Sequence, residues 1–407
     1  MIKISEKTKA YVLAFSLVFI PCIWRYEGDV WHSKWAVMLA CAVLLLGFIL
    51  KTSLNSYPAA LLFTWTLLSS LWVFAWRDNF YVQFETPVRC TFDLFSPSPE
   101  LFKTTACTLY QFEANSSYAA FSFLLFAFLL SVTSVKFLRK VACAFAWAGF
   151  ASSCLVLFRF LQGGMTSLDT GGFFNQGSME GLFIAVTYPL LSEEEIPYPK
   201  KYKIFQSIIV MVLPVLACVV LCWKGEASQP LVLMAIAFHL ILFRNIKFNV
   251  TLVQKITMVL IGLSIVGIVG KFINPRFLDN NNRFPIYKMA YTFWKQDISF
   301  WIFGTGNGSW SVWGPLLQKT THILEGSTFS WMHSDFGQLI FEQGFLGFIL
   351  LIATGCHAIV RAYRTPAMKR VAFSILVYGA GMVFQFPFHL PVHAFLGIFL
   401  LAFSLRQ

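Results

Sequence analysis

The sequence predicts an all-α polytopic membrane protein, with about twelve transmembrane helices and a large, partly helical loop between the ninth and tenth. Composition is the first observation behind this prediction. Hydrophobic residues make up 57% of the 407 residues and charged residues only 12%, about half the share usual in a soluble domain. The second observation is that long apolar runs recur from end to end. The chain is therefore expected to form a single integral membrane domain over residues 1–407.

The apolar runs define the candidate spans. Each run is long enough, or nearly so, to cross a hydrocarbon core of about 30 Å, and the shorter runs are expected to extend into their flanks. The candidate spans are Tyr11–Trp24, Trp35–Leu50, Ala59–Trp76, Tyr118–Val135, Val141–Phe158, Ser178–Leu191, Ile204–Trp223, Pro230–Phe243, Val253–Phe272, Phe345–Val360, Val371–Phe384 and Val392–Leu405.

The net charge of +12 gathers in short loops between these runs. This distribution follows the positive-inside rule of membrane proteins and argues against a nucleic-acid-binding surface. Lys3, Lys7 and Lys9 precede the first run, and every second loop after it is also basic. The alternation predicts that both termini are cytoplasmic and that two long loops, 77–117 and 273–344, lie on the outer face.

Cys90 and Cys107 are the cysteines that fall outside the predicted spans, and both lie in the loop 77–117. An oxidising outer compartment would permit a disulfide between them, and the alternative is two free thiols. His389 and His393 have a spacing compatible with metal binding. Because Pro391 stands between them and no third ligand is evident, no metal site is expected.

The loop 273–344 is rich in polar residues and carries its own helix signals. Pro285 suits an early helical position, after the possible N-cap residues 279–282. A second helix is expected to run from near Ser330 into the tenth span, after the glycine cluster Gly304–Gly308. An amphipathic helix that can lie on the membrane is predicted by apolar residues at helical spacing, namely Ile286, Met289, Ala290, Phe293 and Trp294.

Cations around this loop are candidate phosphate ligands. Arg276, Arg283 and Lys288 lie within the loop, and Lys224 ends the seventh span on the same face. A guanidinium group keeps its charge and binds phosphate oxygens bidentately, whereas the alternative for Arg283 is snorkelling to lipid headgroups. His333 is a candidate general base because imidazole titrates near neutrality, and the alternative is a structural histidine.

The segment His333–Gly347 resembles the signature of the O-antigen ligase and polymerase superfamily. In that family a histidine and an asparagine precede an aromatic residue, a glutamine, a glutamate and two glycines that open a membrane helix. Gln338 and Glu342 match this pattern, whereas Ser334 stands where the family has asparagine.

Two further segments resemble the same family. Arg283, followed by Pro285–Tyr287 and then Gly304–Gly306, resembles its arginine-to-glycine portion. The segment Gly171–Gln176, which includes Asn175, resembles an earlier outer-loop motif. A large outer loop between the ninth and tenth of about twelve spans matches the ligase branch.

The resemblance implies transfer of a glycan from an undecaprenyl-pyrophosphate donor, at the periplasmic face of the bacterial inner membrane. It implies that His333 activates the acceptor hydroxyl and that Arg283 binds the pyrophosphate. Lys224 stands where the family has another arginine. Binding or positioning roles are expected for Arg276, Lys288, Gly304, Gly306, Asn175, Gln338 and Glu342.

No metal or other cofactor is expected for such a transfer, because pyrophosphate leaves well once fixed cations meet its developing charge. The favoured expectation is an O-antigen ligase, whose acceptor is lipid A-core. An O-antigen polymerase and a protein O-oligosaccharyltransferase use the same donor and remain alternatives. A lipid-linked glycan flippase is the non-enzyme alternative, and it would need polar or broken helices in the middle of the membrane.

Overall fold

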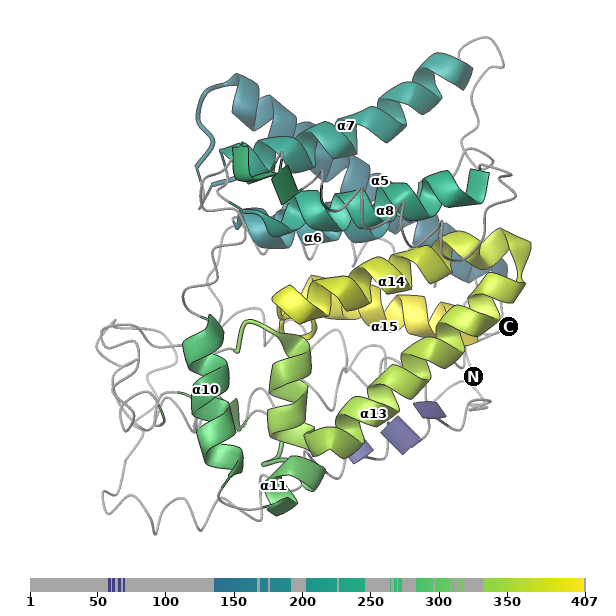
Figure 1. Cartoon of the computed structure of the whole chain (residues 1–407). Coiled ribbons are helices and arrows are strands. Elements are labelled where there is room, and N and C mark those ends of the chain that lie inside the picture. Colours follow the sequence, from purple (N-terminus) through teal and green to yellow (C-terminus); the bar gives the residue numbers. More distant parts are fainter. Residues whose placement is uncertain are drawn as a thin grey trace, which may run out of the picture. The chain divides into compact units, whose positions relative to one another are not determined.

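The computed structural model describes residues 135–191, 203–245 and 332–405 with short gaps, and residues 58–69, 264–272 and 283–317 in part. All regular structure in these residues is helical, and no strand occurs among them (Figure 1). The predicted helical class is therefore confirmed for the described part of the chain. Predictions that lie outside it concern the loop 77–117 with Cys90 and Cys107, the spans Tyr11–Trp24 and Trp35–Leu50, most of Tyr118–Val135, Arg276 and Asn175.

Seven of the predicted spans coincide with helices in the described residues. A 3-10 turn, η2 (Tyr188–Leu190), continues α6, and η4 (Pro366–Met368) and η5 (Pro387–His389) flank α14. Two further helices lie in the loop 273–344, namely α10 (Arg283–Trp294) and α11 (Ile298–Phe303). The seven helices that coincide with predicted spans are α5 (Val135–Leu161), α6 (Gly177–Thr187), α7 (Lys203–Trp223), α8 (Gln229–Asn245), α13 (Asp335–Arg364), α14 (Lys369–Phe384) and α15 (Pro391–Leu405).

The chain divides into two compact units. Unit 1 comprises Met1–His32, Val132–Asp279 and Ala358–Gln407, and unit 2 comprises Ser33–Ser131 and Asn280–His357. Unit 1 therefore contains α5 to α8, α14 and α15, whereas unit 2 contains α10, α11 and most of α13.

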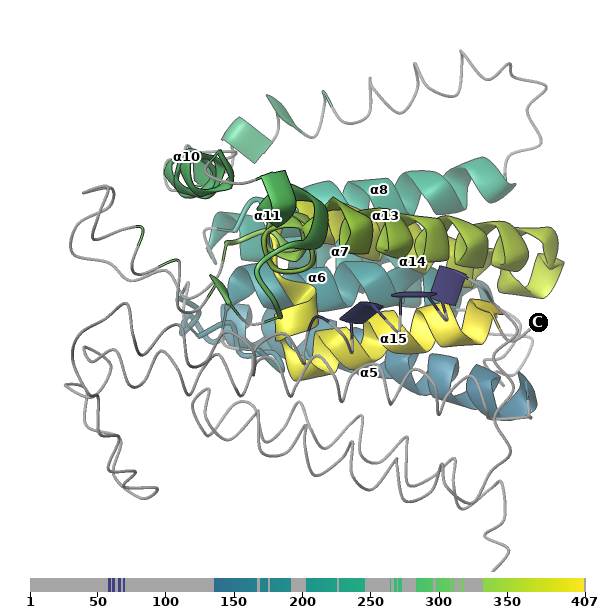
Figure 2. The ribbon, with the colours of Figure 1, turned by 90° about the horizontal axis from the view of Figure 1, so that it is seen from below.

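The helix α6 is the centre of unit 1, because all of its residues are buried. It packs against α5, α7, α8 and α14 (Figure 2). Glycines at the crossings let the helix backbones approach closely. A side chain at Gly181 would overlap the Pro230 ring of α8, and one at Gly381 of α14 would overlap Leu182.

Two arginines cap the carbonyl ends of neighbouring segments in unit 1. Arg361 Nη1 donates to the Leu405 carbonyl at the end of α15, and Arg370 Nη1 donates to the Leu191 carbonyl after η2, both at 2.8 Å. The last carbonyls of a helix lack partners within the helix, and a cation also complements the helix dipole at that end. These bonds bring the ends of α13, α15 and η2 together with the start of α14, which is the grouping that the charge alternation predicts.

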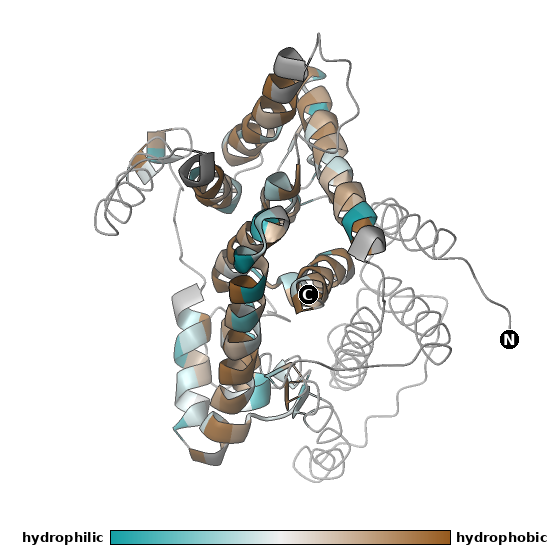
Figure 3. Cartoon of the chain, turned by 90° about the vertical axis from the view of Figure 1, so that its right-hand side faces the viewer, coloured by the Kyte–Doolittle hydropathy of each residue, from teal (hydrophilic) through white to brown (hydrophobic). Residues whose placement is uncertain are grey.

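Two helices of the described residues are long and apolar enough to cross a membrane, Leu138–Leu161 within α5 and Asp335–Arg364. Shorter apolar helices accompany them, among them Val392–Leu405. Figure 3 shows that hydrophobic residues, in brown, recur along most of the described helices. These helices indicate membrane association.

We expect Gly181→Ala to destabilise the protein by about 1–3 kcal/mol, because the added methyl must push α6 away from Pro230. Gly379→Ala, in the interior of α14, is the matched control, because a Cβ there meets no atom within 4 Å. The control should be neutral or stabilising by up to about 1 kcal/mol, since alanine is the better helix former. Thermal unfolding in detergent measures both effects, and equal shifts for the two variants would contradict the close packing of α6.

Candidate functional site

The amphipathic helix predicted in the loop 273–344 is present as α10. Its residues Ile286, Met289 and Ala290 are fully buried, whereas Lys288 is exposed. The expectation that the apolar face lies on the membrane is wrong, because protein side chains cover this face. Those side chains form one hydrophobic core with it, and they are Trp310, Leu317, Met332 and Phe341.

The first turns of α10 pack beside the segment Met332–Gly337. A Cβ atom at Gly337 would lie 3.3 Å from Tyr287 Cε1 of α10 and 3.5 Å from Met332 Cε. Arg283 begins α10, one turn before Tyr287, which is about 6 Å along the helix axis. The predicted arginine and the predicted base therefore come from neighbouring segments of unit 2, although the Arg283 side chain lies outside the described part of the structure.

His333 has an unusual backbone conformation. Its φ angle of 56° is the only positive value at a non-glycine residue among those described. The left-handed region costs an L-residue about 1–2 kcal/mol, and such strain collects at functional sites. His333 is half-buried, between the buried Met332 and the buried Ser334. The residues on either side of His333 are therefore fixed in the core, while its own side chain keeps partial access to solvent.

Ser334 is the N-cap of α13. Its Oγ accepts the N–H of Gly337 at 3.3 Å, and its carbonyl accepts the N–H of Gln338 at 3.0 Å. Serine and asparagine are both strongly favoured at N-caps. Ser334 can therefore do the structural work of the asparagine that the family resemblance leads one to expect.

Gln338 and Glu342 connect Met332, which precedes His333, to Trp310, which follows the glycine cluster Gly304–Gly308. Gln338 Oε1 accepts the N–H of Met332 at 3.2 Å, while its Nε2 donates to Glu342 Oε1 at 2.9 Å. The same carboxylate oxygen accepts the N–H of Trp310 at 3.4 Å. Both side chains are buried. The two residues predicted to position the site thus lie on one polar path that ends directly before His333.

The helix α13 is broken at Gly344, where φ is 71° and ψ is −178°. A break leaves the carbonyls of the preceding turn without helical donors. The residues after Gly304 supply two of the missing donors. Thr305 N–H bonds the Phe341 carbonyl at 3.0 Å, and Gly306 N–H bonds the Glu342 carbonyl at 2.7 Å. A third donor is Trp65 Nε1, 2.9 Å from the Gln343 carbonyl.

Two glycines make this backbone contact sterically feasible. Gly304, with a φ of 76°, would overlap the Glu342 carbonyl group if it carried a Cβ. Gly344 would overlap the Ile302 carbonyl in the same way. The N–H groups of Thr305 and Gly306, within the predicted glycine cluster, thereby reach helix carbonyls.

Thr66, in the predicted span Ala59–Trp76, completes the polar core of unit 2, a role that sequence reasoning missed. Thr66 Oγ1 donates to Gln343 Oε1 at 3.3 Å, and its carbonyl accepts Asn307 Nδ2 at 3.0 Å. Gln343 Nε2 in turn donates to Asn307 Oδ1 at 2.8 Å. All three side chains are buried. Polar residues inside the apolar run Ala59–Trp76 were the available signal, since such residues in a span usually have partners.

The remaining predicted residues are placed as follows. Lys224 belongs to unit 1 and stands exposed over the Trp223 ring, with Nζ 4.6 Å from its centroid. Lys288 points away from the core of unit 2. Their roles stay predictions. His393 is buried and bonds the Met179 carbonyl at 2.9 Å, and no group of three metal-ligating residues occurs among the described residues.

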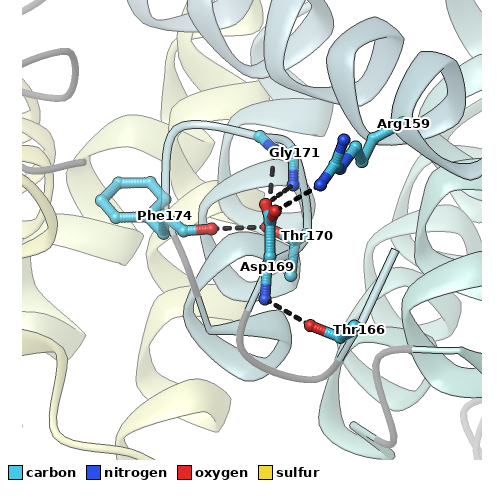
Figure 4. A network of polar contacts seen from close by, with 7 residues as sticks. Arg159, Thr166, Asp169, Thr170, Gly171 and Phe174 are labelled. Atoms are coloured by element: carbon cyan, nitrogen blue, oxygen red, sulfur yellow. Dashed lines mark hydrogen bonds and ion pairs between the residues drawn. The ribbon is translucent and has the colours of Figure 1, made fainter. Parts of the chain in front are cut away.

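The segment Gly171–Gln176 forms a turn tied to Glu180, a fully buried carboxylate that sequence reasoning also missed. Phe174 N–H donates to Glu180 Oε2 at 2.6 Å, and the Ser152 hydroxyl bonds the other oxygen. On the other side of the turn, Asp169 pairs with Arg159 at 2.6 Å and accepts the N–H of Gly171 at 3.2 Å (Figure 4). The N–H groups of the four residues 171–174 are thus bonded within unit 1.

A left-handed backbone alone costs an alanine about 1–2 kcal/mol. We expect Gly344→Ala to destabilise unit 2 by more than this, because the added methyl also meets the Ile302 carbonyl. Gly355→Ala, on the same helix, is the control, since a Cβ there meets nothing within 4 Å. Limited proteolysis and thermal unfolding in detergent report the difference. If both variants matched the parent protein, the proposed contact at the helix break would be refuted.

Comparisons of the chain with protein-family models, with curated proteins and with solved structures find no match. The case for a site therefore depends on the chain's own residues. Its centre is His333, held at the start of α13 beside the first turns of α10.

Proposed function

We propose that this protein is a multi-pass membrane glycosyltransferase of the bacterial inner membrane. It transfers a glycan from undecaprenyl pyrophosphate to a hydroxyl acceptor at the periplasmic face, with His333 as general base and Arg283 as pyrophosphate ligand. Its leading identity is an O-antigen ligase with lipid A-core as acceptor. Both termini are then cytoplasmic. Seven of the about twelve predicted spans correspond to described helices.

One observation carries the proposal, the strained and half-buried conformation of His333 beside α10. A structural histidine needs no left-handed backbone, whereas a general base must present its imidazole in a fixed direction. The buried hydrogen bonds that link Met332, Gln338 and Glu342 support this conformation. The helix that Arg283 begins packs on the same segment.

The chemistry needs few groups. The acceptor hydroxyl oxygen forms a bond to the anomeric carbon while the bond from that carbon to the pyrophosphate oxygen breaks. The hydroxyl proton passes to His333, and undecaprenyl pyrophosphate leaves with the bonding electrons. Cations such as Arg283 and Lys288 stabilise the charge that develops on the leaving group. Holding donor and acceptor together supplies much of the remaining rate enhancement.

A flippase for lipid-linked glycans is the second candidate, and the broken helix α13 favours it. Transporters use discontinuous helices with buried polar groups near the middle of the membrane. In this chain, however, the break at Gly344 precedes the apolar run Phe345–Val360 instead of interrupting it. The polar residues Gln338, Glu342 and Gln343 likewise all stand before the break. This arrangement fits a site at the end of a span, and the enzyme is therefore preferred.

We expect His333→Ala to lower the transfer rate about 10²–10⁴-fold, the usual contribution of a general base, without loss of folding. Purified protein in detergent, supplied with polyprenyl-pyrophosphate glycan and candidate acceptors, provides the assay. His239→Ala is the matched control. This half-buried histidine of α8 bonds the Ala235 carbonyl and belongs to unit 1, so transfer should persist.

The same assay separates the alternatives. Unchanged transfer by His333→Ala, with an unchanged unfolding temperature, would refute the proposed base. Translocation of the donor across vesicles without any transfer by the parent protein would establish the flippase. The acceptor that receives the glycan distinguishes a ligase (lipid A-core) from a polymerase (a second glycan) and from an oligosaccharyltransferase (a protein hydroxyl).

A further inference from the structure

The short helix α11 exposes an apolar face. Ile298, Ile302 and Phe303 are 72%, 45% and 49% exposed. Residues four apart share a helix face, so Ile298 and Ile302 form one ridge with Phe303 beside it. The contrast with α10 is informative, because Ile286, Met289 and Ala290 of its apolar face are buried in the core of unit 2. An uncovered face in the same unit therefore calls for a different partner.

This face is continuous with the apolar surface of α13. Gly344 lies directly against the Ile302 carbonyl, so the end of α11 meets the helix break. Beyond the break, Phe345, Ile349 and Ile352 are 40%, 57% and 39% exposed at helical spacing. They belong to a helix that is long and apolar enough to cross a membrane. One exposed apolar surface thus runs along α13 and turns onto α11.

Aromatic rings and lysines surround the point where the two helices meet. Trp301 of α11 stacks on Phe345 with centroids 5.5 Å apart, and Trp294 lies 4.5 Å from Trp301. Lys295 Nζ stands 4.7 Å from the centroid of the Tyr291 ring. Tryptophan and tyrosine concentrate at the boundary between water and lipid, and lysines there extend to the headgroups.

We infer that α11 and this aromatic cluster form the surface by which unit 2 rests on a phospholipid bilayer. Ile298, Ile302 and Phe303 insert among the outer ends of the acyl chains, and Lys295 faces the headgroup phosphates. The inference rests on the membrane location given in the proposed function. It moves the membrane contact from α10, where the sequence pattern predicts it, to α11.

The contact would set the height of the site above the bilayer. Asp335 and Gly344 are separated by nine helical residues, which is about 14 Å along the axis at 1.5 Å per residue. If the break lies at the headgroup level, His333, two residues before Asp335, stands no more than roughly 21 Å above it. The pyrophosphate of a lipid-linked donor occupies this zone, since its polyprenyl chain stays in the bilayer.

Photoactivatable lipids test the inference on the unmodified protein. The protein is reconstituted in nanodiscs of phospholipid that carries a diazirine near the headgroup end of an acyl chain, and the adducts are mapped by mass spectrometry. We expect lipid adducts on 298–303 and 345–352, and none on Ile286, Met289 or Ala290, which are buried. Adducts absent from 298–303 would overturn the inference, as would crosslinks from that segment to a second copy of the chain in a parallel protein-crosslinking experiment.

Two substitutions sharpen the test. Ile302→Lys places a charge within the proposed contact and should lower the adduct yield on 298–303 several-fold. Gln162→Lys changes an exposed polar residue of unit 1, outside the contact, and should leave the yield unchanged. Equal yields in both variants would contradict the inference. The readout is independent of glycan transfer, so a protein that transfers glycan without these adducts refutes the inference alone, and one with adducts but no transfer refutes the function alone.

Discussion

The arrangement of unit 2 depends on one backbone contact, between the residues after Gly304 and the carbonyls before the break at Gly344. The break deprives Phe341 and Glu342 of helical donors, and Thr305 and Gly306 replace those donors. A buried carbonyl without a partner costs about 1–3 kcal/mol, so neither the break nor the loop is stable alone. Because this contact fixes the first half of α13, it also fixes Gln338, and through Gln338 the backbone that precedes His333.

In unit 1, side chains instead of backbone groups supply the hydrogen-bond partners at helix ends and turns. Arg361 and Arg370 donate to the carbonyls at helix ends, and Glu180 accepts the N–H of the turn that precedes α6. Close glycine contacts around α6 then leave little freedom between the helices. Rigid support of this kind suits a protein whose proposed chemistry depends on fixed cations and a fixed base.

Local sequence patterns predicted what is local in this fold. Apolar runs gave the helices of unit 1 nearly to their ends, and apolar spacing gave α10. Spacing could not tell which partner covers α10, since lipid and protein select the same residues. Thr66 and Glu180 were missed for another reason. Thr66 bonds Gln343 at a separation of 277 residues, a distance at which no periodicity reports pairing. Binding or positioning roles were expected for Gly304 and Gly306, but local sequence does not reveal that the N–H groups of Thr305 and Gly306 bind helix carbonyls.

The long separation within the polar core has a consequence for biosynthesis. The partners of Thr66 and Ser69, at Asn307 and in the turn before Gly344, are translated more than two hundred residues later. At about 5–20 residues per second, the gap between Thr66 and Gln343 corresponds to roughly 15–55 s. During that interval the two hydroxyls must bond to carbonyls of their own helix, as serine and threonine do in apolar surroundings. Synthesis must therefore reach α13 before Thr66 and Ser69 can exchange these temporary bonds for their final ones.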